Sequence, residues 1–261
     1  MGSEMCIRDR YGIVAENEPL AEFPPGIAET RVWVFDADGF GAIVSLLPVE
    51  GFGGSDWEQN AASVSWLGQV ARQHHEVLQY ASINATVVPL RLPSLYQSLE
   101  SLAATLTAAS DRLERDLGRI QGKVEWAVKV YRTAKADGSV SAGSASGRDY
   151  LMARSRDLSA RHTVRQQLSE QVREIHNALG QVSAEQVRNQ PQDAALSGRS
   201  EHMLLNGAYL VSRADEARFL ELVDKIADSS LAKGILVEVS GPWPAYNFTG
   251  DAEATATEAL K

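Results

Sequence analysis

Residues 123–132 (KVEWAVKVYR) alternate in polarity, and this pattern constrains the fold more than any other segment of the chain. Val124 and Trp126 fall on one face of an extended chain, and Glu125 and Lys129 fall on the other. A period of two residues is the period of a β-strand, in which successive side chains point to opposite faces. The segment therefore predicts a strand with one buried face.

Five further elements follow this strand. Hydrophobic spacing predicts a helix, two strands, a second helix and a last strand over residues 149–179, 185–188, 203–212, 214–229 and 234–240. The order β-α-β-β-α-β is that of the ferredoxin-like fold. We therefore expect a ferredoxin-like domain over residues 121–250. It would contain a mobile Gly/Ser-rich linker at 133–147 and be followed by a frayed tail at 251–261.

The helix expected at 149–179 carries a stripe of apolar residues, Leu151, Leu158, Leu168, Val172, Ile175 and Leu179. Arg161, His162 and Arg165 interrupt the stripe. These side chains either face solvent, because long basic side chains reach water easily, or contact a partner.

The first half of the chain mixes strands and helices in another order. Strand patterns begin at Tyr11 and flank Asp36-Ala37-Asp38-Gly39, where Asp-Gly is typical of a hairpin turn. Helices are expected over 57–81 and 95–120, with a short strand between them at 86–90. We therefore expect an α+β domain over residues 11–120, and an α+β protein of two domains. Residues 1–10 (MGSEMCIRDR) fit nothing after them and are expected to be a non-native or disordered leader.

Charge and composition exclude several classes of function. The net charge is −9, which disfavours nonspecific binding to nucleic acid. Residues 1–120 carry 8 basic and 16 acidic groups and residues 121–261 carry 17 and 18, so the two halves differ in surface character. Apolar runs stay far below the roughly 20 residues of a membrane span, and the start lacks the apolar core of a secretory signal. We therefore expect a cytoplasmic protein without membrane contact. Cys6 is the only cysteine, so it has no disulfide partner in the chain.

Motifs that carry chemistry fail on inspection. A calcium loop starting at Asp36 would need oxygen ligands where Phe40 and Leu47 stand. His75-Glu76 starts a zinc-protease pattern, but Gln79 replaces the second histidine. We expect His74 and His75 to be one packed and one solvated residue. No catalytic residue, metal site, cofactor or small-molecule substrate is expected.

A run near the end, Gly241 to Phe248 (GPWPAYNF), resembles the ending of the gas vesicle L/F accessory protein family (GvpL/GvpF). Other segments resemble that family in order: YGIV from Tyr11, WL from Trp66, HEVL from His75, VPLR from Val88, EWAVKV from Glu125, GRDYL from Gly147 and NGAYLV from Asn206. The resemblance implies structural or interface roles for Trp66, His75, Pro89, Arg91, Trp126, Lys129, Arg148, Tyr150, Tyr209, Pro242, Trp243, Pro244, Tyr246 and Phe248.

Three departures from the family pattern stand out. Ala127 replaces a usual glycine and Gly207 replaces a usual alanine, and both exchanges are expected to be tolerated. Leu92-Pro93-Ser94 stands where the family tends to have Phe-Gly-Thr. Pro93 restricts Leu92 to extended backbone, so the contacts of this loop are expected to differ.

The resemblance implies a non-enzymatic accessory factor of gas vesicle assembly, associated with the vesicle and binding the shell subunit, other accessory proteins or both. The Pro242–Phe248 run is expected to act first as a structural clasp, since prolines keep it extended and free its aromatic side chains to pack. Three alternatives stay open: an adaptor for an unrelated protein, an enzyme on a ferredoxin-like fold, and an RNA-binding module. RNA binding would need stacking aromatics, and the strand at 203–212 offers only Tyr209.

Overall fold

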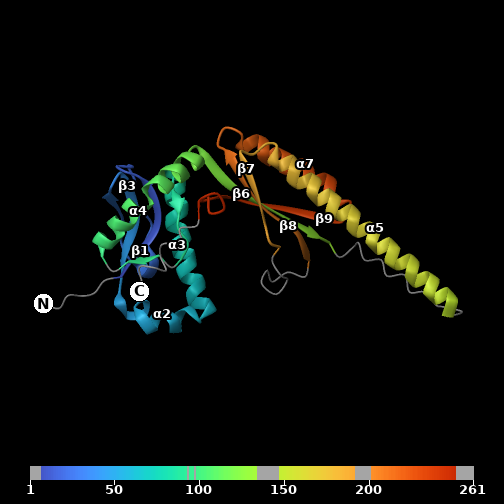
Figure 1. Ribbon diagram of the computed structural model, residues 1–261, viewed down its shortest axis with the longest axis horizontal. Coiled ribbons are helices and arrows are strands. Elements are labelled where there is room, and N and C mark those ends of the chain that lie inside the picture. Colours follow the sequence, from blue (N-terminus) through green and yellow to red (C-terminus); the bar gives the residue numbers. More distant parts are fainter. Residues whose placement is uncertain (1–6, 93, 97, 134–146, 192–200, 251–261) are drawn as a thin grey trace. The chain divides into compact units, whose positions relative to one another are not determined.

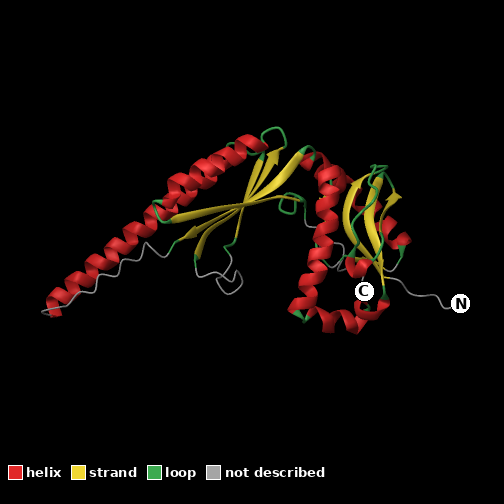
Figure 2. Ribbon diagram, turned by 180° about the vertical axis from the view of Figure 1, so that it is seen from behind, coloured by secondary structure: helices red, strands yellow, loops and turns green. Residues whose placement is uncertain are grey.

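The computed structural model describes residues 7–92, 94–96, 98–133, 147–191 and 201–250. The chain divides into two compact units. The first comprises residues 1–124 and 243–261, and the second comprises residues 125–242. The expected second domain included residues 243–250, whereas contacts group these residues with the first unit. Both units mix helices and strands (Figures 1 and 2).

The first unit is a sheet with helices on two sides. Its strands are β1 (Ile7–Ala15), β2 (Val32–Ala37), β3 (Phe40–Leu47), β4 (Val88–Pro89) and β5 (Leu95–Tyr96). The order is β2-β3-β1-β4, and β5 also pairs with β1. Its helical segments are η1 (Ile27–Glu29), α1 (Val49–Phe52), α2 (Gly54–Ala61), α3 (Val64–Asn84) and α4 (Leu99–Ile120). Figure 1 shows α3 and α4 on either side of this sheet.

The expected helix at 57–81 is two helices, α2 and α3. Ser63 separates them with extended backbone, and its hydroxyl accepts a hydrogen bond from the backbone N–H of Trp66. Serine is a preferred helix-capping residue for this reason. Ser98 caps α4 in the same way, through the N–H of Ser101 at 3.1 Å. The helix expected at 95–120 therefore begins at Leu99, after the short strand β5.

Strand β1 begins before the expected Tyr11. Ile7 to Arg10 pair with β3, and Asp9 and Arg10 are buried. This corrects the expected leader over residues 1–10 for its last four positions. Asp9 and Arg10 interrupt the apolar alternation that would indicate a strand in the sequence. In the folded protein, pairing with β3 and the covering helices bury these two residues.

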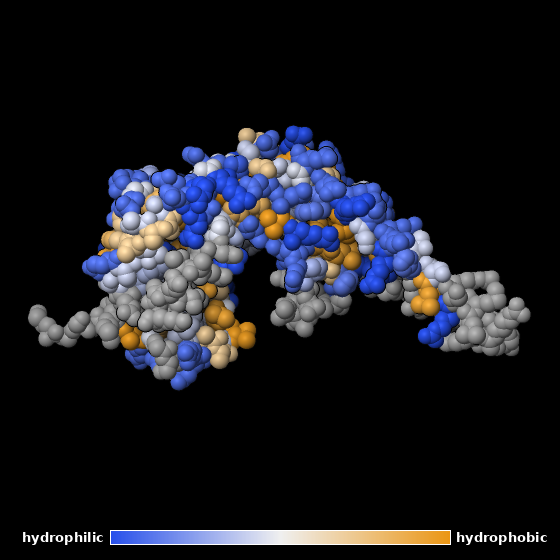
Figure 3. All heavy atoms as spheres, in the orientation of Figure 1, coloured by the Kyte–Doolittle hydropathy of each residue, from blue (hydrophilic) through white to orange (hydrophobic). Residues whose placement is uncertain are grey.

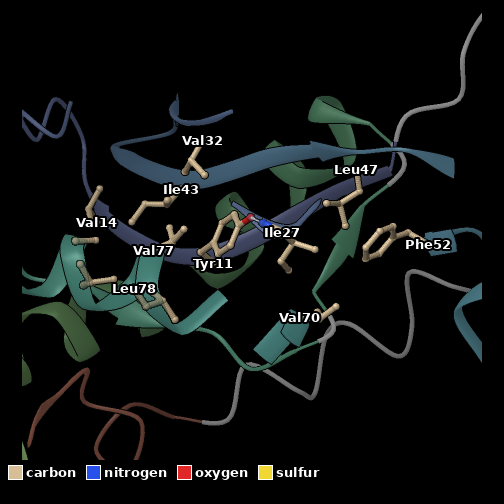
Figure 4. Packing of buried hydrophobic residues seen from close by; sticks show 12 residues of the cluster. Tyr11, Val14, Ile27, Val32, Ile43, Leu47, Phe52, Val70, Val77 and Leu78 are labelled. Carbon is tan, nitrogen blue, oxygen red and sulfur yellow. Dashed lines mark hydrogen bonds between the residues drawn. The ribbon is translucent and has the colours of Figure 1, made fainter. Parts of the chain in front are cut away.

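A bulge between Arg10 and Gly12 changes the register of β1. Such a bulge adds one residue and redirects the side chains that follow it. The side chain of Tyr11 enters the main core, where Figure 4 shows it among Ile27, Val77 and Leu78.

The second unit follows the order expected from the sequence. Its elements are β6 (Lys123–Arg132), α5 (Gly147–Gly180), β7 (Glu185–Asn189), β8 (His202–Ser212), α7 (Glu216–Leu231) and β9 (Ile235–Trp243). The sheet order is β7-β8-β6-β9. Both helices lie on one side of this sheet (Figures 1 and 2). The expected linker at 133–147 and the tail at 251–261 lie outside the described residues, except Thr133 and Gly147.

The stripe expected along α5 is only half realised. Val172, Ile175 and Leu179 are buried against the second unit, but Leu158 is 59% exposed. His162 and Arg165 are exposed, whereas the side chains of Leu151 and Arg161 lie outside the described residues. The described side chains before Leu168 are exposed, where α5 extends past the strands of its unit (Figure 1).

Candidate functional site

The family-like run after β9 folds into a compact turn. The backbone N–H of Tyr246 donates to the carbonyl of Pro244 at 2.7 Å, and that of Phe248 donates to the carbonyl of Ala245 at 3.1 Å. Pro244, Ala245 and Phe248 are buried. The prolines leave few backbone donors to satisfy, so the turn can be buried at low cost. We call residues 243–250 the return segment.

The return segment is fastened to the first unit at three points. The ring of Trp243 lies 4.9 Å, centroid to centroid, from the ring of His75 on α3. Tyr246 packs against the main core of the unit. The N–H of Gly250 donates to Asp116 Oδ2 on α4 at 3.1 Å. Two motifs that lie far apart in the sequence, at His75 and Trp243, therefore meet in space.

His75 is half-buried by this contact rather than solvated. Burial lowers the pKa of its imidazole, the adjacent His74 lowers it further, and Glu76 raises it. The neutral ring is thus favoured in the folded state. This corrects the expectation of one solvated histidine, since the packing partner of His75 lies about 170 residues away in the sequence and a local pattern does not reveal it.

His74 is the packed histidine that the pattern predicted. Its Nε2 lies 3.0 Å from the carbonyl oxygen of Leu90, so that nitrogen carries a proton and donates. Its Nδ1 lies 3.5 Å from Asp9 Oδ2, and its ring stacks on Tyr11 at 4.9 Å. These contacts join α3 to β1 and to the end of β4.

The other motif residues of the first unit support its core. The ring centroid of Trp66 lies 5.3 Å from that of Phe52 and 5.4 Å from that of Trp57, and the three rings form an aromatic group beside the core. Pro89 pairs with Gly12 in the ladder between β1 and β4. Arg91 follows β4 and is exposed. Of these residues, only Arg91 projects well into solvent.

In the second unit, Tyr209 is the best-connected motif residue. It is fully buried, and its hydroxyl lies 2.7 Å from His176 Nδ1 on α5. The centroid of its ring lies 5.6 Å from the ring centroid of Phe219 on α7. Burial raises the pKa of the Tyr209 phenol, and burial together with Arg188 lowers the pKa of the His176 imidazole. Tyr209 thus ties a central strand to both helices and is not free to stack on a nucleotide base.

Gly207 makes room for Tyr209. A Cβ atom at position 207 would lie 2.7 Å from the Tyr209 hydroxyl oxygen, closer than non-bonded atoms approach. The exchange expected to be tolerated is the one this chain carries, glycine in place of the alanine usual in the family. In this chain the phenol occupies that space, so the exchange of Gly207 for alanine requires the ring to move.

Trp126 and Gly241 form a second close approach in this unit. Trp126 is buried on β6, and a Cβ at Gly241 would lie 2.9 Å from its ring. Gly241 also has a φ of 141°, which side-chain-bearing residues rarely adopt. Pro242 follows through a cis peptide bond. Lys129 is half-buried on the same strand as Trp126.

Arg148 and Tyr150 stand in the first turn of α5, and their side chains lie outside the described residues. Their expected role stays a prediction.

A buried hydrogen-bond network around Tyr11 was not expected from the sequence. The hydroxyl of Tyr11 lies 2.9 Å from Ser45 Oγ. It accepts a hydrogen bond from the backbone N–H of Ile27 at 3.0 Å (Figure 4). Burial raises the pKa of Tyr11 to about 12. Gly12, next to it, was the available signal, because a glycine inside a strand marks a close approach of neighbouring atoms. A Cβ there would lie 2.7 Å from Val87.

The described residues contain no group of three or more His, Cys, Asp or Glu side chains placed to hold a metal ion. None of the described helices has the length and apolar character of a bilayer span. Hydrophilic side chains cover most of the face in Figure 3, with separate apolar patches among them. Apart from Arg91, the motif residues whose side chains are described are buried or half-buried.

Comparison with known proteins shows which family the chain resembles. The family model described as gas vesicle synthesis protein GvpL/GvpF matches residues 10–250. Gas vesicle protein L of a Streptomyces strain is 34% identical over 223 residues, 83% of this chain and 82% of that protein. Gas vesicle protein F2 of Halobacterium salinarum is 26% identical over 239 residues, 91% of this chain and 89% of that protein.

Solved structures share the fold. The crystal structure of GvpF from Anabaena matches with a TM-score of 0.71 at 18% identity, covering 95% of this chain and 98% of that one. GvpF from Microcystis aeruginosa matches with a TM-score of 0.69 at 19% identity, covering 94% and 99%. The mixed α/β fold with two sheets and the resemblance seen in the sequence therefore agree, and this chain belongs to the gas vesicle GvpL/GvpF family.

Proposed function

We propose that this chain is a non-enzymatic accessory factor of gas vesicle assembly that binds the shell subunit, other accessory proteins or both. The observation that carries the proposal is the family match over residues 10–250. We further propose that the protein works in the cytoplasm at the growing vesicle. Its second unit, with strand order β7-β8-β6-β9, is proposed to be a ferredoxin-like domain.

A physical argument supports a binding role. A shell that encloses gas presents apolar surface, and before assembly such surface favours aggregation. A soluble partner that covers this surface keeps the subunit in solution. The net charge of −9 suits this task, because like charges on the complexes oppose their association.

Co-expression with the shell subunit tests the proposal. We expect the soluble fraction of the subunit to rise when this chain is present, and the two proteins to purify together. Apolar burial should supply most of the affinity, so co-purification should survive moderate salt. No gain in solubility and no co-purification at either low or high salt would overturn direct binding of the shell subunit.

A salt-dependent outcome refines the mechanism. If co-purification occurs at low salt only, the partnership stands and is chiefly electrostatic. A chain of similar size and charge from outside gas vesicle biology is the control for a general solubilising effect.

A further inference from the structure

Strand β2 forms an edge of the first sheet, since β3 is its only neighbour among the strands that the structure describes. The turn between the two strands has positive φ at both central residues, Asp38 (55°) and Gly39 (83°), as in a type I′ hairpin. Ala37 and Phe40 face each other across this turn, and in a two-residue hairpin the pair that flanks the turn is the hydrogen-bonded one. Bonded and non-bonded pairs then alternate along the ladder. The backbone groups that point away from β3 are therefore those of Val32, Val34 and Asp36.

These outward backbone groups have no loop or turn backbone bonded to them within the described part of the chain. Exposed edges are commonly protected by lysine or proline, or by a covering segment. Strand β2 (VWVFDA) contains neither residue, and it is partly or fully exposed from Trp33 onward, whereas Val32 at its start is buried. Its chemistry is that of a strand able to accept another strand.

A groove of about 580 Å³ runs beside this edge. The loop at residues 20–25 forms one wall and residues 29–34 form the other. Contacts with α3 hold the loop: Phe23 packs on Tyr80 at 5.4 Å, and the Tyr80 hydroxyl donates to the carbonyl of Ala21. The groove thus exists before anything binds, with Trp33 among its apolar lining residues.

The surroundings of the groove are acidic. Residues 16–38 contain six acidic side chains, Glu16, Glu18, Glu22, Glu29, Asp36 and Asp38, against the single Arg31, a net charge of −5. Five of the six acidic residues are exposed, and Glu18 is half-buried. Like charges oppose the pairing of this edge with the same edge of a second copy, and they favour a basic partner.

We propose that β2 and its groove receive an extended segment of a partner protein in which apolar and basic residues alternate. The segment adds a strand to the sheet through Val32, Val34 and Asp36, its apolar side chains enter the groove, and its basic side chains meet the acidic rim. This inference rests on the proposed function in one respect, namely that the partner belongs to gas vesicle assembly. The chemistry of the segment follows from the edge, the groove and the charge.

A synthetic peptide of six alternating valine and lysine residues, as long as β2, is the probe. We expect it to bind the full chain and to slow hydrogen exchange at the amides of Val32, Val34 and Asp36. The amides of Trp33 and Phe35 already face β3 and should change little. Uniform protection along β2, or protection confined to other strands, would overturn strand addition.

Methylated peptides test the backbone contacts without altering the protein. One carries N-methyl groups on its valines and the other on its lysines. In an added strand only one of these two sets of amides faces β2. Binding should therefore fall about tenfold for one peptide and persist for the other. Equal, undiminished binding of both would exclude backbone pairing.

Charge variants test the rim. Glu22→Lys should weaken peptide binding roughly five-fold at low salt and much less at high salt. Glu58→Lys, on exposed α2 and outside the groove lining, is the matched control and should bind as the wild type does. Equal binding by both variants at low salt would remove the acidic rim from the proposal.

Co-expression of the wild type with the shell subunit, compared with the peptide-binding assay, separates the two proposals. If the wild type captures the subunit but the peptide fails to bind, the groove is wrong and the proposed function stands. If the peptide protects β2 while the subunit is never captured, the docking edge stands and the proposed partner is wrong.

Discussion

The ring of Trp243 lies 4.9 Å, centroid to centroid, from the ring of His75, joining the return segment to the long helix α3. The Trp243 side chain is half-buried rather than fully buried. Trp243→Ala should therefore lower the free energy of unfolding by about 2 kcal/mol, below the 3–5 kcal/mol typical of a fully buried aromatic. Trp243→Phe should recover part of the loss. Urea denaturation measures both.

This experiment also tests the clasp hypothesis. If Trp243→Ala leaves stability unchanged and abolishes capture of the shell subunit, the return segment is an interface and not a clasp.

The lowered pKa of His75 predicts a dependence of stability on pH. Because the ring resists protonation in the folded state, the unfolded chain binds the proton first as pH falls below about 6.5. Stability should therefore fall as pH drops from that value to the lowered pKa of the folded protein. Urea denaturation between pH 5 and 8 measures this slope.

His75→Gln should make the slope shallower. His176, whose pKa is also lowered, remains in both proteins and cancels in the comparison. Identical slopes in the variant and the wild type would mean that His75 titrates normally in the folded state.

Gly207→Ala should destabilise the second unit by about 1–3 kcal/mol, because the new methyl group presses on the Tyr209 phenol. Tyr209→Phe removes the nearest oxygen and the hydrogen bond to His176, at a cost of about 1 kcal/mol. In the double variant the total loss should be slightly smaller than the sum of the two separate losses, because the contact with the hydroxyl oxygen is gone while the contact with ring carbon Cε2 at 2.8 Å remains. Strict additivity would show that the hydroxyl oxygen contributes nothing to the close approach.

Tyr11→Phe should cost about 1–3 kcal/mol, because Ser45 and the N–H of Ile27 lose a buried partner. Tyr80→Phe, whose hydroxyl bonds a surface carbonyl, is the control and should cost about 0.5 kcal/mol. Equal losses in these two variants would argue against a special role for the buried network.

The same network predicts an alkaline transition. With the pKa of Tyr11 raised to about 12, the folded state keeps the phenol neutral while the unfolded chain ionises near 10. Stability should therefore decline as pH rises through this interval, and less steeply in Tyr11→Phe.

The sequence alone determined much of the second unit. Alternation over residues 123–132 corresponds to β6, and the expected β-α-β-β-α-β order is the order of the elements that the structure describes in this unit. Period and turn chemistry are local properties, so a single chain displays them. Asp38-Gly39 likewise predicted the hairpin between β2 and β3, because few residues other than Gly, Asn and Asp adopt positive φ at low cost.

Tertiary structure decided what local patterns do not encode. Asp9 and Arg10 are buried because β3 and the helices cover them, although their charge indicated a surface segment. Residues 243–250 join the first unit because its helices offer His75 and Asp116, far away in the sequence. The space at Gly207 depends on where the Tyr209 ring lies, and the open edge at β2 depends on the strand order. Each of these features arises from contacts between distant segments, which a pattern of neighbouring residues does not contain.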